Sequence, residues 1–311
     1  MSEFVNKKTV LITGGSGLLA INWACAIRNR FEVILGTHSH SVKLKGITQC
    51  KLYLDDMVKL ESQIDQLSPD IIVHTAGLTS VDLCEKNPSL AQKVNAEMAR
   101  NIASLSDKYN IKLIHISTDH LFSDSGTLYS ESSIPNPLNE YGKSKLLAEK
   151  WVTDSNNQAI IARTNFFCWG SAIRKSFSDW IINNLRDENT LNMFDDIFIT
   201  PILADSLALL SHELVDNDAS GIFNIVSNDR ISKYDFGIKI AKHFGLSSKY
   251  IIRDQIANSN LYVKRPHDMS LDNTKVVQKL GKKVESLEVS FNNLLLQEKQ
   301  GRKKELYESV I

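Results

Sequence analysis

The chain of 311 residues lacks an excess of charge of either sign and lacks any long apolar run. Lysine plus arginine and aspartate plus glutamate number 36 each, so the formal net charge is zero. This balance excludes the broad positive surface that is typical of general nucleic-acid binders. No apolar run approaches the length that crosses a bilayer, and the polar start lacks the features of a secretory signal peptide. We therefore expect no nucleic-acid partner and no membrane association.

Cysteine is also scarce, with four residues scattered over the sequence. Cys25, Cys50, Cys84 and Cys168 form no CxxC pair, and no histidine stands at a zinc-binding spacing from them. The sequence therefore offers no metal ligand set and no disulfide framework. Unpaired thiols are typical of a reducing compartment, so we expect buried cysteines in a cytoplasmic protein.

Short strand-like runs alternate with helical patterns through the first half of the chain. The β-branched runs cover 9–13, 32–36, 50–54, 70–76, 112–118 and 159–163, and the helical patterns include 17–30 and 89–109. This alternation predicts an α/β fold with a doubly wound parallel sheet of the Rossmann type.

The second half is less regular. Helical patterns near 174–187, 203–215, 232–244 and 287–297 surround one strand-like run at 221–227. We predict a main domain over 1–165 and a smaller C-terminal, substrate-binding lobe over 166–311. Within that lobe, the segment at about 221–228 is expected to return to the main domain.

A glycine-rich turn, TGGSGLLA, follows the first strand-like run and opens a helix. It fits the G-x-G-x-x-A pattern, with Ala20 as the last small residue. Glycines permit a tight turn and let the backbone approach a pyrophosphate at a helix N-terminus. In this context the pattern predicts a dinucleotide site. The expected cofactor contacts here are Gly14, Gly15, Gly17, Leu18 and Leu19.

The segment after the second strand bears on which dinucleotide binds. An acid about 20 residues beyond the glycine turn usually binds the ribose of NAD. Here the sequence reads GTHSHSVKLK, whose hydroxyls and cations suit the 2′-phosphate of NADP, although a plain polar loop is the other interpretation. We expect NADPH, with NADH as the alternative, and contacts at Thr37, His38 and Ser39. After the third strand come Asp55 and Asp56, which would contact the adenine or cap the next helix.

A second polar cluster follows the strand KLIHIS, where Ser117, Thr118 and Asp119 stand. Ligands of a doubly wound sheet bind at the carboxyl ends of the strands, so this edge is placed for chemistry. Tyr141 and Lys145 come next, one turn apart on one face of a helix. An ammonium there would lower the pKa of the phenol and make proton transfer easier. Tyr141 would then donate a proton, Thr118 would hold a carbonyl oxygen, and Lys145 would also hold the nicotinamide ribose.

Taken together, the Y-x-x-x-K pair, the glycine turn and the hydroxyl after the fifth strand resemble the extended short-chain dehydrogenase/reductase superfamily. Within it, ISTDHLFSDSGTLYSESSIPNPLNEYGKSKLLAE is similar to the dTDP-4-dehydrorhamnose reductase family, as are HTAGLTSVDLCEKNP, VNAEMARNIA, ARTNFFCWG, DDIFITPILADSLA and KRPHDMSLDNTKVVQKLG. The resemblance covers most of the chain. It implies a catalytic triad of Thr118, Tyr141 and Lys145, with a supporting role for Asn95. The further contacts that it implies are Ala76, Gly77, Tyr141, Lys145 and Thr164 for the cofactor, and Thr79, Asp119, His120, Phe166 and Arg265 for the substrate.

Two of these positions depart from the family pattern. His120 stands where relatives usually carry an aromatic residue, and Phe166 stands where they carry tryptophan, so the rhamnose precursor need not be the substrate. Nucleotide-sugar dehydratases carry an acid at the position of His120, which argues against dehydration. A histidine there is expected as a pocket wall or hydrogen-bond donor. For Arg265, a surface ion pair is the plain structural alternative.

The resemblance implies an NADPH-dependent reductase of the 4-keto group of a nucleoside-diphosphate 6-deoxy sugar, in deoxysugar and polysaccharide biosynthesis. One alternative is a nucleotide-sugar epimerase that holds NAD, which the missing acid after the second strand disfavours. The other is a non-catalytic NADP-binding regulatory subunit of the same fold, which the intact Thr–Tyr–Lys set disfavours. A homodimer through helices that flank the sheet is implied by the resemblance alone.

Overall fold

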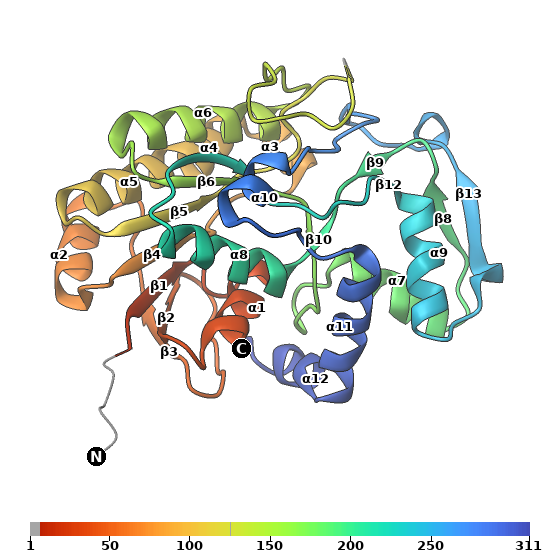
Figure 1. The fold of residues 1–311 in the computed structure, drawn as a ribbon, viewed down its shortest axis with the longest axis horizontal. Coiled ribbons are helices and arrows are strands. Elements are labelled where there is room, and N and C mark those ends of the chain that lie inside the picture. The colour runs from red at the N-terminus through yellow and green to blue at the C-terminus, as the bar shows by residue number, and fades with distance from the viewer. Residues whose placement is uncertain (1–6, 125) are drawn as a thin grey trace.

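The centre of the molecule is a parallel β-sheet, seen in a computed structural model that describes residues 7–124 and 126–311 (Figure 1). Within these residues, seven strands lie in the order β11-β6-β5-β4-β1-β2-β3, and each neighbouring pair is parallel. The strands are β1 (Thr9–Thr13), β2 (Glu32–Thr37), β3 (Thr48–Lys51), β4 (Ile71–His74), β5 (Lys112–Ile116), β6 (Ile160–Arg163) and β11 (Gly221–Asn224). The predicted doubly wound sheet is confirmed.

Helices cover both faces of this sheet. On one face lie α1 (Leu18–Ile27) and α8 (Ala204–Asp216), and on the other lie α2 (Met57–Leu67), α5 (Met98–Lys108) and α6 (Glu140–Ser155) (Figure 1). The inner strands β1, β4, β5 and β6 are mostly apolar because both of their faces are buried, whereas the edge strand β3 is polar and largely exposed.

Strand β1 shows how the two layers of core are built. Val10 and Ile12 pack into the cluster that contains α1 and α8. Leu11, between them in sequence, packs with α2, α5 and α6. Successive side chains of a strand point to opposite faces, so one strand supplies both cores.

The strand order places a crevice beside β1. The chain moves outward from β1 through β2 to β3, and then crosses to β4, β5, β6 and finally β11 on the other side. Ligands of such sheets bind at the carboxyl ends of the strands where the order reverses, which is here between β1 and β4.

Two predicted elements have different bounds in the structure. The strand expected at 50–54 spans Thr48–Lys51 instead, because the amide of Tyr53 donates to Gln63 Oε1 at 3.1 Å and leaves the sheet. The single helix expected at 89–109 is interrupted. It consists of α4 (Pro88–Gln92), a π-helical turn (Lys93–Glu97) and α5. A π turn carries an extra residue, which apolar periodicity does not reveal.

Of the remaining elements, α3 lies between β4 and α4 in the sequence, and the others follow β6. Strand β11 pairs with β6, so the segment near residue 221 lies in the main sheet. The short pairs β8–β13, β9–β12 and β7–β10 form outside it. The predicted domain boundary near residue 165 stays a prediction.

The remaining helices and strands have the following bounds: α3 (Val81–Lys86), β7 (Phe166–Phe167), α7 (Phe177–Arg186), β8 (Leu191–Phe194), β9 (Phe198–Ile199), β10 (Ile202–Leu203), β12 (Ile231–Ser232), α9 (Lys233–His243), β13 (Ile251–Asp254), α10 (Thr274–Leu280), α11 (Leu287–Lys299), α12 (Arg302–Tyr307) and two 3₁₀ turns (Ser248–Tyr250, Ile256–Asn258).

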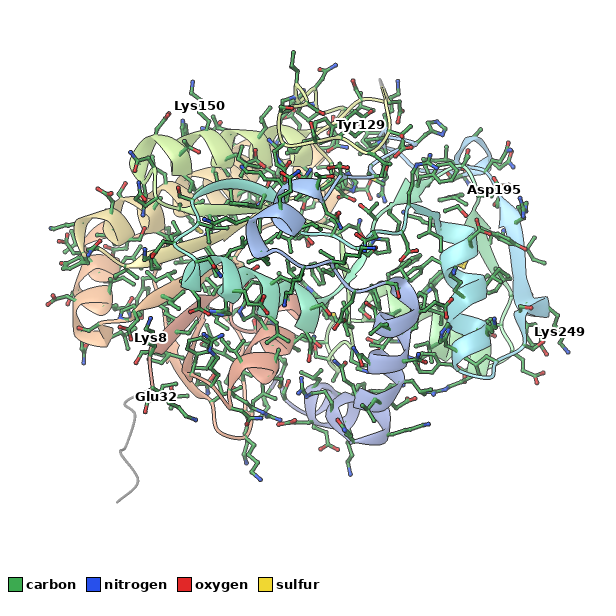
Figure 2. The ribbon with its side chains drawn as sticks, viewed as in Figure 1. Lys8, Glu32, Tyr129, Lys150, Asp195 and Lys249 are labelled. Carbon is green, nitrogen blue, oxygen red and sulfur yellow. The ribbon has the colours of Figure 1, made fainter. Side chains whose placement is uncertain are left out.

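Charged side chains of both signs project from the outside of the molecule. Lys8 and Glu32 lie side by side at one end of the sheet, and Lys150 and Lys249 lie at distant parts of the surface (Figure 2). In the part of the chain that the structure describes, no helix combines the length and apolar character that a membrane span requires.

Candidate active site

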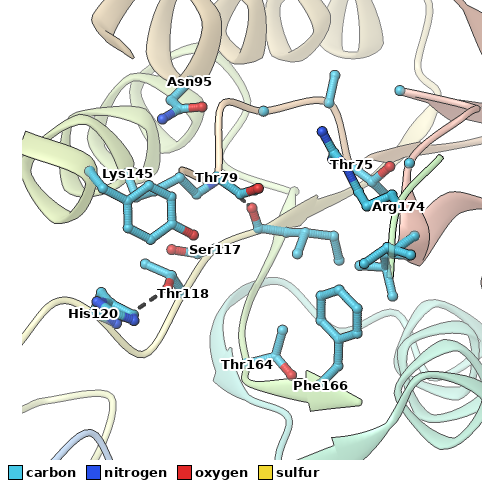
Figure 3. Close-up of a pocket in the computed structure, with 18 of the residues that line it drawn as sticks. Thr75, Thr79, Asn95, Ser117, Thr118, His120, Lys145, Thr164, Phe166 and Arg174 are labelled. Carbon is cyan, nitrogen blue, oxygen red and sulfur yellow. Dashed lines mark hydrogen bonds between the residues drawn. The ribbon is translucent and has the colours of Figure 1, made fainter. Parts of the chain in front are cut away.

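A cavity of about 640 Å³ lies at the carboxyl ends of β1, β4 and β5 (Figure 3). Its wall combines the glycine turn, the loop after β4, the end of β5, the first turns of α6 and the loop after β6. This is the place where the strand order reverses, so the fold itself brings these segments together.

The glycine turn forms one end of the cavity. Gly14 has a φ of +66°, and a Cβ there would lie 2.8 Å from Ala76 Cα, so only glycine fits. The amide of Gly17 donates to the Gly14 carbonyl at 2.8 Å and closes the turn. Helix α1 then begins without a side-chain cap, with its first amides at the cavity. Of the expected contacts, Gly14, Gly17, Leu18 and Leu19 line the cavity, and Gly15 packs against β2 instead.

The segment after β2 contributes less than expected. Ser39 lines the cavity together with His40. Thr37 is buried and donates its hydroxyl to the Cys50 carbonyl at 3.2 Å, and His38 does not line the cavity.

The two acids after β3 have structural partners. Asp56 caps α2 by accepting from the amide of Lys59, and Asp55 pairs with Lys93 at 3.3 Å. Neither aspartate lines the cavity. Of the two interpretations offered for this pair, the helix cap is therefore realised at Asp56.

Thr118, Tyr141 and Lys145 all line the cavity, and Thr118 and Lys145 lie at the end away from the glycine turn (Figure 3). Helix α6 starts just before Tyr141, where Asn139 caps it by accepting from the Gly142 amide at 3.0 Å. The first turn of α6 packs on the backbone of His120, and a side chain at Gly142 would collide there. This close approach holds the phenol next to the end of β5.

Burial dominates the protonation of the two helix residues. It raises the pKa of Tyr141 to about 12, against the opposing effect of the Thr118 hydroxyl. Burial also lowers the pKa of Lys145 to about 8, against the opposing charge of Glu149. Lys145 Nζ donates to the Ile116 carbonyl at 2.6 Å. The ammonium of Lys145 is thus bound to the end of β5, and the predicted lowering of the Tyr141 pKa by Lys145 stays a prediction.

Asp119 and His120 form the wall beside the phenol. Asp119 is buried, accepts from Asn165 Nδ2 at 2.6 Å, and has its pKa raised to about 6 by burial. The His120 ring meets the Tyr141 ring edge-on at 5.5 Å, and burial lowers the pKa of His120 to about 3. A neutral imidazole at this place is a wall or a hydrogen-bonding group, as the sequence suggested.

The other expected contacts divide into two groups. Those that line the cavity are Ala76, Gly77, Thr79, Thr164 and Phe166. Arg265 does not line it and instead approaches Asp82 at 3.4 Å, which is the ion-pair alternative.

Asn95 lines the cavity and holds the loop after β4 in place. Its side chain accepts from the Leu78 amide at 2.7 Å and donates to the Leu78 carbonyl at 3.1 Å and to Ser144 Oγ at 2.8 Å. The π turn places Asn95 opposite both α6 and this loop. The residue therefore ties the cofactor side of the cavity to the helix that carries Tyr141 and Lys145.

Arg174 is a cavity residue that sequence reasoning missed. It stands in the loop between β7 and α7, which is closed by the Ser171 amide donating to the Arg174 carbonyl at 2.9 Å. The side chain reaches across the cavity toward Thr75, on the side of the glycine turn (Figure 3). An irregular loop carries no periodic signal, so only the folded chain reveals this cation.

Comparison with known proteins identifies the family. The family model described as the RmlD substrate binding domain matches residues 8–299. The chain belongs to the RmlD family. A probable low-salt glycan biosynthesis reductase of Haloferax volcanii is 30% identical to this RmlD-family chain over 275 residues, which cover 87% of this chain and 91% of that protein. The family resemblance carried by the motifs is thereby confirmed.

Two further similarities are informative. Methionine adenosyltransferase 2 subunit beta of Xenopus laevis is 26% identical over 287 residues, which cover 89% of this chain and 84% of that protein. The crystal structure of a dTDP-4-dehydrorhamnose reductase from Bacillus anthracis in complex with NADP aligns with a TM-score of 0.84 at 22% identity, over 94% of this chain and 99% of that one. This structural likeness shows the fold of the RmlD-family chain.

Proposed function

We propose that this RmlD-family protein reduces the 4-keto group of a nucleoside-diphosphate 6-deoxy sugar, with NADPH as the reductant and NADH as the alternative. The observation that carries the proposal is the convergence of Thr118, Tyr141 and Lys145 on the same cavity as the glycine turn. A hydroxyl, a protonated phenol and a cation beside a dinucleotide-type turn are the groups that carbonyl reduction requires. The similarity to a probable glycan biosynthesis reductase supports the same class of reaction.

The glycine turn fits a dinucleotide. The close approach of Gly14 to Ala76 keeps the floor of the turn free of side chains, and α1 directs its uncapped N-terminus at the cavity. Backbone amides at a helix N-terminus bind pyrophosphate. We assign Arg174 to the same phosphates from the opposite wall, because a guanidinium suits phosphate oxygens. When bound, NADPH would supply the hydride that the sugar C4 receives.

The protein groups would manage the proton and the oxygen. Thr118 Oγ1 would donate a hydrogen bond to the sugar O4 and hold the carbonyl in place. Tyr141 would transfer its phenolic proton to O4, and the raised pKa of Tyr141 keeps that proton in place beforehand. The Lys145 cation would then stabilise the phenolate that forms.

The sugar would lie against His120 and Phe166, the two positions where this chain departs from the family pattern. A neutral imidazole and a phenyl ring make a wall of different shape and polarity from the usual pair of large aromatic residues. We therefore infer that the 6-deoxy sugar differs from the rhamnose precursor in the groups that face this wall.

The second candidate is a non-catalytic, NADP-binding regulatory subunit. It is favoured by the similarity to subunit beta of methionine adenosyltransferase 2 over most of both chains. Such a role would require tight NADP binding and a stoichiometric partner enzyme, with no turnover of a keto sugar. A pull-down with purified protein from a cell extract, followed by mass spectrometry of stoichiometric partners, distinguishes the two candidates.

The reductase proposal is tested by following NADPH absorbance with a panel of nucleoside-diphosphate 4-keto-6-deoxy sugars. We expect one sugar nucleotide to be reduced at least about tenfold faster than the others, because pocket contacts discriminate by 1–3 kcal/mol. Released cofactor should be analysed in the same preparation. NAD that copurifies with the protein, with interconversion of sugars and no net NADPH oxidation, would indicate an epimerase instead.

A further inference from the structure

A buried carboxylate, Glu149, lies behind the cavity and takes no part in the steps proposed above. It stands one helical turn after Lys145 on α6 and is 3% exposed. Buried carboxylates are rare unless they are paired, so its partners indicate why it is there.

Glu149 joins three elements through charge-assisted hydrogen bonds. Arg163, at the end of β6, donates from Nε to Oε1 at 2.9 Å and from Nη2 to Oε2 at 2.7 Å. Ser117, at the end of β5, donates its hydroxyl to Oε1 at 2.5 Å. Each of these side chains is at most 5% exposed. The two parallel N–H donors of a guanidinium fix the carboxylate in one orientation.

This arrangement sets the distance between Thr118 at the end of β5 and the pair Tyr141 and Lys145 on α6. Ser117 precedes Thr118 directly, whereas Tyr141 and Lys145 stand on the helix that carries Glu149. A carboxylate locked by Arg163 and bonded to Ser117 therefore holds the end of β5 against α6. Movement of either segment would break a short, buried hydrogen bond.

The charge of Glu149 also bears on Lys145. The titratable or charged groups around the Lys145 end of the cavity are Tyr141 and Glu149 on α6, His74 on β4, His115 on β5, Asp119 after β5 and Arg163 on β6. Burial lowers the pKa of His74 to about 3 and lowers the pKa of His115 well below its usual value, so both rings are neutral. Glu149 is the group that opposes the effect of burial on the pKa of Lys145.

We propose that Glu149 is a positioning residue of the reductase site, which fixes Ser117–Thr118 against α6 and sets a buried carboxylate one helical turn from Lys145. The inference rests on the proposed function for its effect on turnover, but its effect on Lys145 is independent of any substrate. Neither Glu149 nor Arg163 is expected to touch the substrate or the cofactor, since neither lines the cavity.

The test uses the isosteric variant Glu149→Gln, with Asp154→Asn as the matched control. Asp154 is an exposed acid on the same helix, so it loses the same charge without losing a buried partner. Lys145 is titrated by NMR on protein labelled with [¹³C]lysine, and its signal is identified by its loss in Lys145→Arg. The pH profile of kcat and the Kd of NADPH are measured in parallel.

In Glu149→Gln we expect the titration midpoint of Lys145 to fall by about one pH unit. At a pH well above the midpoint, the protonated fraction of Lys145 would then be about tenfold lower. The alkaline limb of the kcat profile should move down in pH with it, since the protonated Lys145 is lost as pH rises through its pKa. The Kd of NADPH should change by less than about threefold, and Asp154→Asn should match wild type throughout.

An unchanged Lys145 midpoint, or a kcat and pH profile that both match wild type, would overturn the inference. If neither protein turns over any sugar, the proposed function fails, and the NMR titration alone still decides whether Glu149 acts on Lys145. If Glu149→Gln does not fold, the double variant Glu149→Gln, Arg163→Met is used, because it removes both buried charges together. Since these two charges act on Lys145 with opposite sign, the deciding result in the double variant is a loss of kcat with an unchanged Kd of NADPH, and a kcat equal to that of wild type would overturn the inference.

Discussion

Replacing Arg163 by methionine should destabilise the protein strongly. The substitution removes the hydrogen bonds of 2.7, 2.9 and 3.2 Å that Arg163 donates to Glu149, and a bond to a charged group is worth roughly 1.5–3 kcal/mol. It also leaves a carboxylate at 3% exposure whose remaining hydrogen-bond donor among the described residues is Ser117. Breaking a buried pair by removing one partner costs about 3–5 kcal/mol, and we expect a loss of stability in that range.

Urea unfolding followed by tryptophan fluorescence measures this loss, since Trp23 and Trp169 are both fully buried. Arg186→Met is the matched control, because Arg186 forms an equally bidentate pair with Glu298 at the surface, where a pair is worth less than about 1 kcal/mol. The double variant Arg163→Met, Glu149→Gln should regain most of the stability. The reasoning would be refuted if Arg163→Met cost no more than Arg186→Met, or if the double variant were as unstable as Arg163→Met.

Two further predictions concern the cofactor side of the cavity. Gly14→Ala should weaken NADPH binding by at least about tenfold, because the new Cβ would collide with Ala76. Gly46→Ala is the control, since Gly46 has a similar φ of +72° but open space around it, and this variant should bind NADPH normally. Fluorescence titration checks both, and normal binding by Gly14→Ala would contradict the placement of the turn. Arg174→Ala should raise the Kd of NADPH and of NADH by a similar factor of about ten, since the pyrophosphate is common to both, and Lys175→Ala should not. A change for NADPH alone would assign Arg174 to the 2′-phosphate instead.

The fold could be predicted because its signals are local. Most strands of the main sheet are short apolar runs, and the glycine turn stands between the first strand and its helix, as the dinucleotide pattern requires. The Y-x-x-x-K spacing likewise places Tyr141 and Lys145 on one helical face, whatever the rest of the chain does. These features depend on neighbours within a few residues, so one sequence is sufficient.

The rest depends on partners that are remote in sequence. The sequence left Asp55 open between an adenine contact and a helix cap, and Arg265 open between a substrate contact and an ion pair. The fold pairs Asp55 with Lys93 and Arg265 with Asp82. The π turn at Asn95 adds one residue to an otherwise regular helix. A single added residue changes the apolar periodicity of the whole segment too little to be detected in the sequence. Arg174 reaches the cavity from a loop whose path is set by tertiary packing.

The proposed reduction is tested most directly by comparing wild type with Tyr141→Phe in NADPH oxidation with a dTDP-4-keto-6-deoxyhexose. The substitution removes the phenolic proton and leaves the ring against His120. We predict that kcat falls by about 10²–10⁴-fold, the usual contribution of a general acid, while the Kd of NADPH stays within about threefold of wild type. Turnover by Tyr141→Phe at the rate of wild type would contradict the account.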